Sequence, residues 1–310
     1  MRELICGTRG SKLAMIQTNW VIDELQKAGI KNPIQIKTID TKGDKNRQVS
    51  LPSLGGRGVF LAEIEKELIE EEIDFAVHSL KDVPVELPEE LTLAAIPLRE
   101  DHRDVLLQAD GRTLQTLAAG SVIGTSSIRR AAQLLAQRPD IQTQWIRGPI
   151  DSRIEQLRNG DFDAIVLAAA GLNRLNIGQE LIAEYLPVDT FVPSMGQGAL
   201  VIETRAADRE VNELLTAIND EKTEQAVNAE RHFLKCFEEG EQAPIGGYAK
   251  LVDNALHLHG VVINADGSKI LEHNATGTNP IAVAEETANE LIRQGALDII
   301  AEVNEALRNS

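Results

Sequence analysis

The chain has 310 residues, 43% hydrophobic and 25% charged, an ordinary composition for a globular protein with room for two or three domains. Its formal net charge of −17 argues against nucleic acid as a partner, because phosphate backbones bind basic surfaces. No apolar run reaches the roughly 18 residues of a transmembrane helix, and the N-terminus lacks the apolar core of a signal peptide. We therefore expect a cytoplasmic chain that does not bind membranes.

Cysteine, histidine and arginine usage narrows the chemistry. Cys6 and Cys236 are too few for a disulfide framework, and we expect both to be buried thiols. No CxxC or HExxH spacing occurs, so we expect no metal site. No lysine lies between Lys81 and Lys222, although that span is rich in arginine. Arginine forks suit carboxylates and phosphates, so the bias favours a small polyanionic ligand, with compositional drift as the alternative.

The first hundred residues alternate predicted strands and helices. Strands are expected at residues 4–6, 34–39, 74–77 and 91–96, and helices at 12–28 and 60–71, with Ser11 as N-cap of the first helix. Residues 7–11 would be a turn. The glycine-rich residues 54–58 lack the GK[ST] ending of a P-loop and read as a mobile flap or an inert loop. A charged connector at residues 97–101 marks an expected crossing into a second domain.

The second part of the chain repeats the first. GTRGSKLA at residues 7–14 and GTSSIRRA at 124–131 share a strand, Gly-Thr, a serine cap and a helix that opens with basic residues. The strand DFAV at 74–77 has an echo in DAIV at 163–166, the latter within an apolar strand expected to reach residue 170. Two short matches could arise by chance, but together they predict two similar α/β lobes.

The rest of the chain predicts a return to the first lobe and then a third domain. Residues 193–198 form a turn-rich link, and 199–203 a strand that rejoins the first lobe. A helix at 224–237, strands at 249–252, 255–263 and 268–272, and helices at 281–294 and 297–307 suggest a small α+β domain. The predicted fold is α/β, with two similar periplasmic-binding-protein-like lobes plus a small α+β C-terminal domain. Its boundaries are 1–98 with 198–218, 99–197, and 219–310.

The stretch DFAVHSLKDVP at residues 74–84 carries the strongest chemical signal. It places Lys81 and Asp82 just beyond a buried strand, where α/β proteins bind ligands and where a carboxylate can act as acid or base. The alternative is that Lys81 and Asp82 form an ordinary surface ion pair at the end of the strand. If the two lobes face each other, the cations near the corresponding turns would line one cleft that suits a ligand with several carboxylates: Arg9, Lys12, Arg129, Arg130, Arg147, Arg153 and Arg174.

Several motifs resemble those of porphobilinogen deaminases (hydroxymethylbilane synthases). They are HSLKDVP at residues 78–84, GTSSIRR at 124–130, Arg147-Gly148, LAAAGL at 167–172 and GQGA at 196–199. The resemblance runs from Gly7 to the last helix. It implies a transferase that joins four porphobilinogen molecules head to tail with loss of ammonia, in tetrapyrrole and haem biosynthesis. It also implies a dipyrromethane cofactor, and we expect a monomer.

The resemblance also implies roles for individual residues. Asp82 would be the catalytic carboxylate, stabilising positive charge that develops on a pyrrole nitrogen. The positions that hold the dipyrromethane or growing chain would be Ser79, Lys81, Asp82, Thr125, Ser127, Arg129, Arg130, Arg153 and Arg174. Those nearer the incoming porphobilinogen would be Arg9, Ser11, Gln17, Arg147 and Gln197. Residues 55–60 would form a lid.

One position departs from the family pattern. The family carries its cofactor on a cysteine in a Gly-Gly-Cys-Gln loop, where this chain has Glu239-Gly240-Glu241-Gln242. Glu241 stands at the cysteine position, and a carboxylate is a poorer nucleophile than a thiolate. Cys236, five residues earlier, is a weaker candidate anchor. The open alternatives are an enzyme with a differently held cofactor, a weakly active or inactive homologue that only binds pyrrole carboxylates, and, outside the family, a solute-binding protein.

Overall fold

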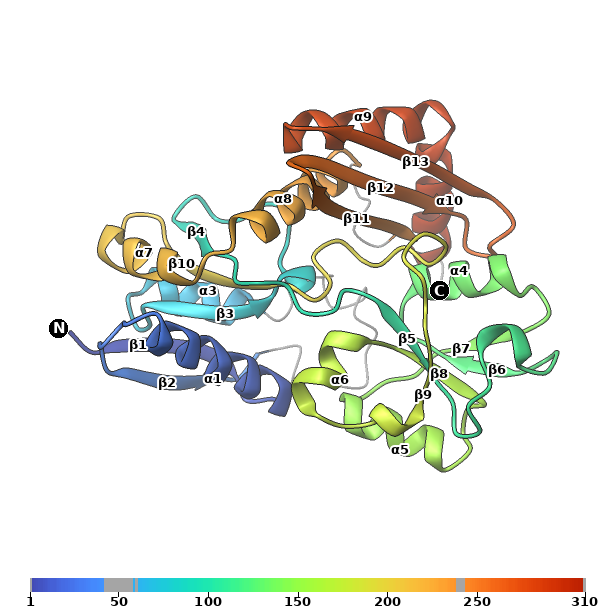
Figure 1. Ribbon diagram of the computed structural model, residues 1–310, viewed down its shortest axis with the longest axis horizontal. Helices are drawn as coiled ribbons and strands as arrows, with labels where there is room; N and C mark the ends of the chain where they lie inside the picture. The colour runs from blue at the N-terminus through green and yellow to red at the C-terminus, as the bar shows by residue number, and fades with distance from the viewer. Residues whose placement is uncertain (1, 42–57, 59–60, 238–242, 309–310) are drawn as a thin grey trace. The chain divides into compact units, whose positions relative to one another are not determined.

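The computed structural model describes residues 2–41, 58, 61–237 and 243–308, and Figure 1 shows its elements. The chain forms two compact units, Met1–Glu100 with Gly198–Gln225, and Asp101–Gln197 with Ala226–Ser310. Helix α8 (Glu221–Lys235) runs from the first unit into the second. The division into three domains stays a prediction. In the described part of the chain no helix is long and apolar enough to cross a membrane.

The first unit is one α/β lobe. Its sheet has the order β2-β1-β3-β10-β4, in which β1 pairs in parallel with β2 and β3, while β10 is antiparallel to β3 and β4. Helices α1 and α7 cover one core that includes Phe75, and α3 covers another that includes Ala76. The elements are β1 (Leu4–Arg9), α1 (Lys12–Lys27), β2 (Ile34–Ile39), α3 (Ala62–Ile69), β3 (Phe75–Ser79), β4 (Leu91–Ala95), β10 (Leu200–Arg205) and α7 (Arg209–Leu215).

The second unit opens with a lobe of the same topology. Its sheet has the order β7-β6-β8-β5-β9, with β6 parallel to β7 and β8, and β5 antiparallel to β8 and β9. The elements are β5 (Asp104–Leu107), β6 (Val122–Gly124), α4 (Ile128–Gln137), β7 (Gln142–Gln144), α5 (Ile150–Arg158), β8 (Ala164–Ala168), α6 (Ala169–Leu175) and β9 (Ile182–Tyr185). We call these two sheets with their helices the first and second lobes.

The C-terminal residues of the second unit form a three-stranded antiparallel sheet. The sheet consists of β11 (Ile245–Val252), β12 (Ala255–Ile263) and β13 (Ile270–Gly277), and Figure 1 shows α9 (Pro280–Arg293) beside β13, with α10 (Ala296–Arg308) following. This sheet shares a core with the second lobe, where Ala132 and Val192 pack with Val261 and Ile263. The α/β class with a small α+β addition is therefore confirmed.

The repeat predicted from sequence has a structural basis. In the first lobe, Asp74 Oδ2 accepts the Ile5 N–H at 2.7 Å, and in the second, Asp163 Oδ2 accepts the Val122 N–H at 2.7 Å. Each aspartate thus ties two neighbouring parallel strands together, β3 to β1 in the first lobe and β8 to β6 in the second. A Cβ on Gly7 would lie 2.3 Å from Ile73 Cδ1, so a larger residue there would force the end of the Ile73 side chain to move.

Local boundaries differ from several expectations. Residues 7–9 continue β1 instead of turning, because β2 supplies backbone partners as far as Ile39. The expected strand at 165–170 ends at Ala168, and the alanines after it begin α6, in keeping with their high helix propensity. Of the turn expected between Arg147 and Arg153, the part from Ile150 onward is instead the first part of α5. Strands β5, β7 and β9 and helix α7 were not predicted.

Candidate functional site

The C-terminal end of β3 in the first lobe places Ser79, Lys81 and Asp82 close together in the chain. Ser79 ends the strand, and residues 80–82 form a single 3-10 turn in which Lys81 and Asp82 are partly exposed. The Leu80 N–H donates to the Ala199 carbonyl at 3.0 Å, which holds this turn to the chain entering β10. Asp82 therefore lies on a short turn directly after a buried strand, as the sequence predicts.

In the first lobe, a residue expected to contact the substrate forms a hydrogen bond with a residue expected to contact the cofactor. The Gln17 amide Nε2 on α1 donates to Ser79 Oγ at 3.0 Å, and the Gln17 side chain is buried. Ser11 caps α1, its Oγ accepting the Ala14 N–H at 3.3 Å, and Arg9 ends β1. The start of α1 and the end of β3 thus form one polar region of the first lobe.

Thr125 and Ser127 build the corresponding helix start in the second lobe. Thr125 Oγ1 accepts the Ser127 N–H at 3.2 Å, and Ser127 Oγ accepts the Arg130 N–H at 3.3 Å as the N-cap of α4. The positive end of the helix dipole and the remaining N–H groups favour anions at such a position. The serine cap and its neighbours lie where the sequence predicts.

Asp104, which the sequence analysis did not single out, binds three of the predicted site residues, Arg129, Arg130 and Gln197. Asp104 opens β5, is fully buried, and accepts from Arg129 Nη2 at 2.7 Å, Arg130 Nε at 2.9 Å and Gln197 Nε2 at 2.9 Å. Burial alone would raise the pKa of this carboxyl, but the two arginine charges lower that pKa to about 2. The sequence signal that could have pointed to Asp104 is an acidic residue at the start of an otherwise apolar four-residue strand.

The same arginines also bind backbone oxygens inside the second lobe. Arg129 Nη1 donates to the Val192 carbonyl at 2.6 Å, and Arg130 Nη1 to the Val166 carbonyl at 3.0 Å. Both side chains are at least nine-tenths buried. These contacts make Arg129 and Arg130 part of the internal structure of the lobe, and their predicted contact with a ligand stays a prediction.

Arg153 differs from its neighbours. Its Nε donates to the Gly148 carbonyl at 2.7 Å and its Nη1 to Ser126 Oγ at 3.3 Å, so both partners are neutral. Burial, together with the nearby charges of Arg130 and Arg147, lowers the pKa of this guanidinium to about 10. Arg174 lies on α6 and is partly exposed. A partly buried cation among other cations is a site that a carboxylate or phosphate would stabilise.

The two cysteines are poorly suited to nucleophilic chemistry. Cys6 is fully buried in β1, and burial raises the pKa of its thiol far above the ordinary range. Cys236 follows α8, and its Sγ contacts the His232 carbonyl oxygen at 3.3 Å. Burial and, to a lesser extent, Glu285 raise the pKa of the Cys236 thiol. Both shifts reduce the population of the reactive thiolate. Glu241 and the expected lid at 55–60, except Gly58, lie outside the described residues.

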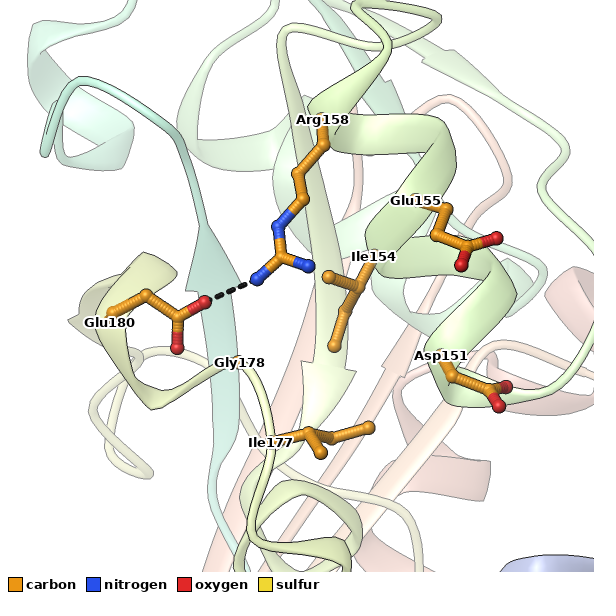
Figure 2. Close-up of a pocket in the computed structure, with 7 residues that line it drawn as sticks. All are labelled: Asp151, Ile154, Glu155, Arg158, Ile177, Gly178 and Glu180. Carbon is orange, nitrogen blue, oxygen red and sulfur yellow. Dashed lines mark hydrogen bonds and ion pairs between the residues drawn. The ribbon is translucent and has the colours of Figure 1, made fainter.

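The second lobe also has a groove, whose lining residues are drawn in Figure 2. It has a volume of about 310 Å³ and lies between α5 and the segment after α6. Arg158 forms an ion pair with Glu180 across it, and the other residues that line it are Asp151, Ile154, Glu155, Ile177 and Gly178. Its charged side chains are mostly acidic, which would repel a polycarboxylate. None of the predicted site residues lines this groove.

Comparisons with known proteins agree with the motif reading. Residues 4–213 match the family model "Porphobilinogen deaminase, dipyromethane cofactor binding domain", and residues 224–294 match the family's C-terminal domain. The chain is 50% identical over 307 residues to a porphobilinogen deaminase of Oceanobacillus iheyensis, covering 99% of each chain. It is 50% identical over 311 residues to that of Shouchella clausii, covering 100% of each.

A solved structure with some similarity is the periplasmic VFT2 domain of Bordetella pertussis BvgS, with a TM-score of 0.41 and 16% identity over 70% of this chain and 86% of that one. The family matches together span nearly the whole chain and contain every predicted site residue. The chain belongs to the porphobilinogen deaminase family.

Proposed function

We propose that this chain is a hydroxymethylbilane synthase, a transferase that condenses four porphobilinogen molecules head to tail and releases ammonia at each step, in tetrapyrrole biosynthesis. The observation that carries the proposal is Arg153, a partly buried cation with only neutral described partners and with Arg130 and Arg147 nearby. Every pyrrole of the growing product carries an acetate and a propionate. Such a chain supplies the carboxylates that this region of the second lobe would bind.

The first lobe would supply the reacting group. Loss of ammonia from porphobilinogen leaves positive charge spread onto the pyrrole nitrogen, and a nearby carboxylate stabilises that charge and can move the proton. We assign this role to Asp82, which follows β3 on a short turn. Lys81 and Ser79 beside it would bind carboxylates of the growing chain. Arg9, Ser11 and Gln17 would act on the incoming porphobilinogen.

The dipyrromethane cofactor of the family fits this chain only in part. The cofactor supplies the end onto which pyrroles are added, and Arg153 with Thr125 and Ser127 offers charge and hydrogen-bond donors for its carboxylates. A thioether anchor does not fit, because Glu241 stands at the family's cysteine position and the thiols of Cys6 and Cys236 have raised pKa values. We therefore derive no step through an attached cofactor.

The test is turnover of porphobilinogen by the purified chain, followed through released ammonia and the linear tetrapyrrole. We expect turnover in the unmodified chain and its abolition in Asp82→Asn. Asp23→Asn is the matched control, because Asp23 is an exposed acid on α1 of the same lobe. Absence of turnover in the unmodified chain would overturn the proposal in favour of a homologue that only binds pyrroles. Full turnover in Asp82→Asn would remove Asp82 from its role.

The anchor is tested separately by the mass of the denatured protein before and after incubation with porphobilinogen. We expect no adduct on the unmodified chain. In Glu241→Cys we expect a mass gain of two linked pyrrole units, because the substitution restores the family's nucleophile. Adding Cys236→Ser should leave that gain unchanged. An adduct on the unmodified chain that peptide mapping places on Cys236 would contradict this assignment.

We also propose that the chain acts in the cytoplasm as a monomer, with porphobilinogen as its partner and with neither nucleic acid nor membranes. The net charge of −17 supports the exclusion of nucleic acid. Light scattering on the purified chain measures the oligomeric state. A mass twice that of the 33.8 kDa chain would contradict the monomer.

A further inference from the structure

A buried histidine–glutamate pair joins β3, the strand that leads into the Asp82 turn, to its neighbour β10. His78 Nε2 lies 3.1 Å from Glu203 Oε2, and the two side chains are 5% and 0% exposed. His78 is on β3 and Glu203 on β10. In the antiparallel register His78 faces Val201 and Glu203 faces Ala76, so the pair is diagonal on one face of the sheet. That face packs against α3.

The His78–Glu203 pair is poorly arranged to stabilise the folded state. Glu203 Oε1 is buried and has no hydrogen-bond partner among the residues that the structure describes. An unsatisfied oxygen on a buried carboxylate costs free energy, and buried ion pairs can often be replaced by apolar residues without loss of stability. The negative charge of Glu203 also contributes, after burial, to raising the pKa of Glu65 on α3. The stability of the fold therefore does not explain why position 203 carries an acidic residue.

The place of the pair in the fold gives a better reason. His78 directly precedes Ser79, and the Leu80 N–H donates to the Ala199 carbonyl just before β10 begins. The turn that follows is closed by the Val83 N–H, which donates to the Leu80 carbonyl at 3.1 Å. The direction in which Asp82 points therefore depends on how the last residues of β3 align with β10. The His78–Glu203 hydrogen bond joins the side chains of β3 and β10 where this alignment is set.

We propose that Glu203 is a positioning residue for the reaction. By holding His78 it fixes the end of β3, and through it the segment that presents Ser79, Lys81 and Asp82. The inference rests on the role proposed above for Asp82. Small displacements of a reacting group are costly, since about 1 Å can lower a rate on the order of a hundredfold. A neutral hydrogen-bond acceptor at position 203 would preserve the link, whereas an apolar side chain would not.

The experiment compares Glu203→Ala, Glu203→Gln and the control Val201→Ala, which removes buried volume opposite His78 but leaves the pair intact. We expect kcat to fall about ten- to hundredfold in Glu203→Ala with KM little changed. Glu203→Gln should recover most of that loss, and Val201→Ala should keep the unmodified kcat. Equal kcat in Glu203→Ala and the unmodified chain would overturn the proposal, as would a Gln variant as slow as the Ala variant.

Hydrogen exchange provides a readout that does not need turnover. The amides of Leu80 and Val83 should exchange faster in Glu203→Ala than in Val201→Ala, because only the former loosens the turn before Asp82. Unchanged exchange at these amides would overturn the positioning role even if the chain made no product. A lack of turnover with the expected exchange difference would instead count against the proposed reaction alone.

A double substitution covers the case in which Glu203→Ala fails to fold. His78→Leu with Glu203→Leu replaces the buried polar pair by apolar side chains, which buried sites often accept at equal or higher stability. We expect this variant to fold, to unfold at the same or higher urea concentration, and still to show lowered kcat and faster exchange at Leu80. A stable double variant with full kcat and unmodified exchange would overturn the proposal.

Discussion

The two lobes share a topology, and each carries a fully buried acid on the fourth strand in its sheet order, with a different set of partners. In the second lobe, both oxygens of Asp104 on β5 accept hydrogen bonds, from Arg129 on one side and from Arg130 and Gln197 on the other. In the first lobe, Glu203 on β10 is bound through one oxygen by His78, and its other oxygen has no partner among the described residues.

The difference separates two uses of a buried charge. Asp104 neutralises two arginines that would otherwise be buried cations, so its removal should affect the stability of the lobe. Glu203 satisfies a single histidine at the end of the strand that carries Asp82, so its removal should affect position more than stability. Identical strand order therefore does not imply identical energetics, because the side chains on the shared scaffold decide what each acid does.

The largest expected effect tests the second lobe. Asp104→Asn leaves Arg129 and Arg130 without their carboxylate, and breaking a buried ion pair in this way costs about 3–5 kcal/mol. We expect the urea midpoint to fall steeply, far more than in Glu203→Gln, which keeps a hydrogen-bond acceptor. If both substitutions lowered the free energy of unfolding equally, the distinction between the lobes would be lost.

The next effect concerns Arg153, the cation of the second lobe whose described side-chain partners are neutral. Arg153→Gln should weaken porphobilinogen binding about ten- to hundredfold, since a charged hydrogen bond contributes about 1.5–3 kcal/mol. The ligand-free chain should be no less stable, because burial and neighbouring cations disfavour this charge. Arg158→Gln on the same helix is the control, and it should leave binding unchanged. Calorimetry gives the affinity, and a clear loss of stability in Arg153→Gln would contradict this view.

Acid should act on the Asp104 network in a definite pH range. The folded pKa of Asp104 is about 2, below its ordinary value of 3.8, so the ionised carboxylate stabilises the fold above about pH 4. That contribution, about 2 kcal/mol, is lost as the pH falls from about 4 to 2. Carbon-13 NMR of the Asp104 carboxyl in the folded chain measures the midpoint directly. A midpoint near 4 would show that the arginines do not lower this pKa.

Much of the lobe repeat could be predicted from the sequence because it depends on local patterns. Gly7 and Gly124, the serine caps and the aspartates that open β3 and β8 appear as short matching strings. Strand β5 could not be predicted in this way. It is four residues long, and its antiparallel partners lie far along the chain. Pairing at such a distance leaves no periodicity in the local sequence.

The sequence could predict where the residues of the candidate site lie in the strands and helices, but not the contacts that they make inside the lobe. The sequence places Lys81 and Asp82 after a buried strand, and the structure agrees. It also gives Arg129 and Arg130 to a ligand because they open a helix among other cations, and nothing local shows that Asp104 binds both. A buried charge network is a product of tertiary packing, and only the acid that opens β5 hints at it.

The smallest expected effect compares the lobes through their equivalent aspartates. Asp74 and Asp163 each accept a backbone N–H of the neighbouring strand at 2.7 Å, so alanine at either position removes one such bond. Asp163 is exposed, and its loss should cost about 1 kcal/mol or less, because water can replace the acceptor. Asp74 is more buried and also lies 3.2 Å from Arg2 and 3.5 Å from Arg205.

Asp74→Ala should therefore lower the free energy of unfolding more than Asp163→Ala, by roughly a further 1 kcal/mol. Urea unfolding of both variants at low and high salt separates the two contributions. The extra cost at Asp74 should shrink in high salt, because its ion pairs are partly solvent-exposed, whereas the shared backbone bond should be insensitive to salt. Equal costs at both positions would mean that the arginines add nothing to the strand link in the first lobe.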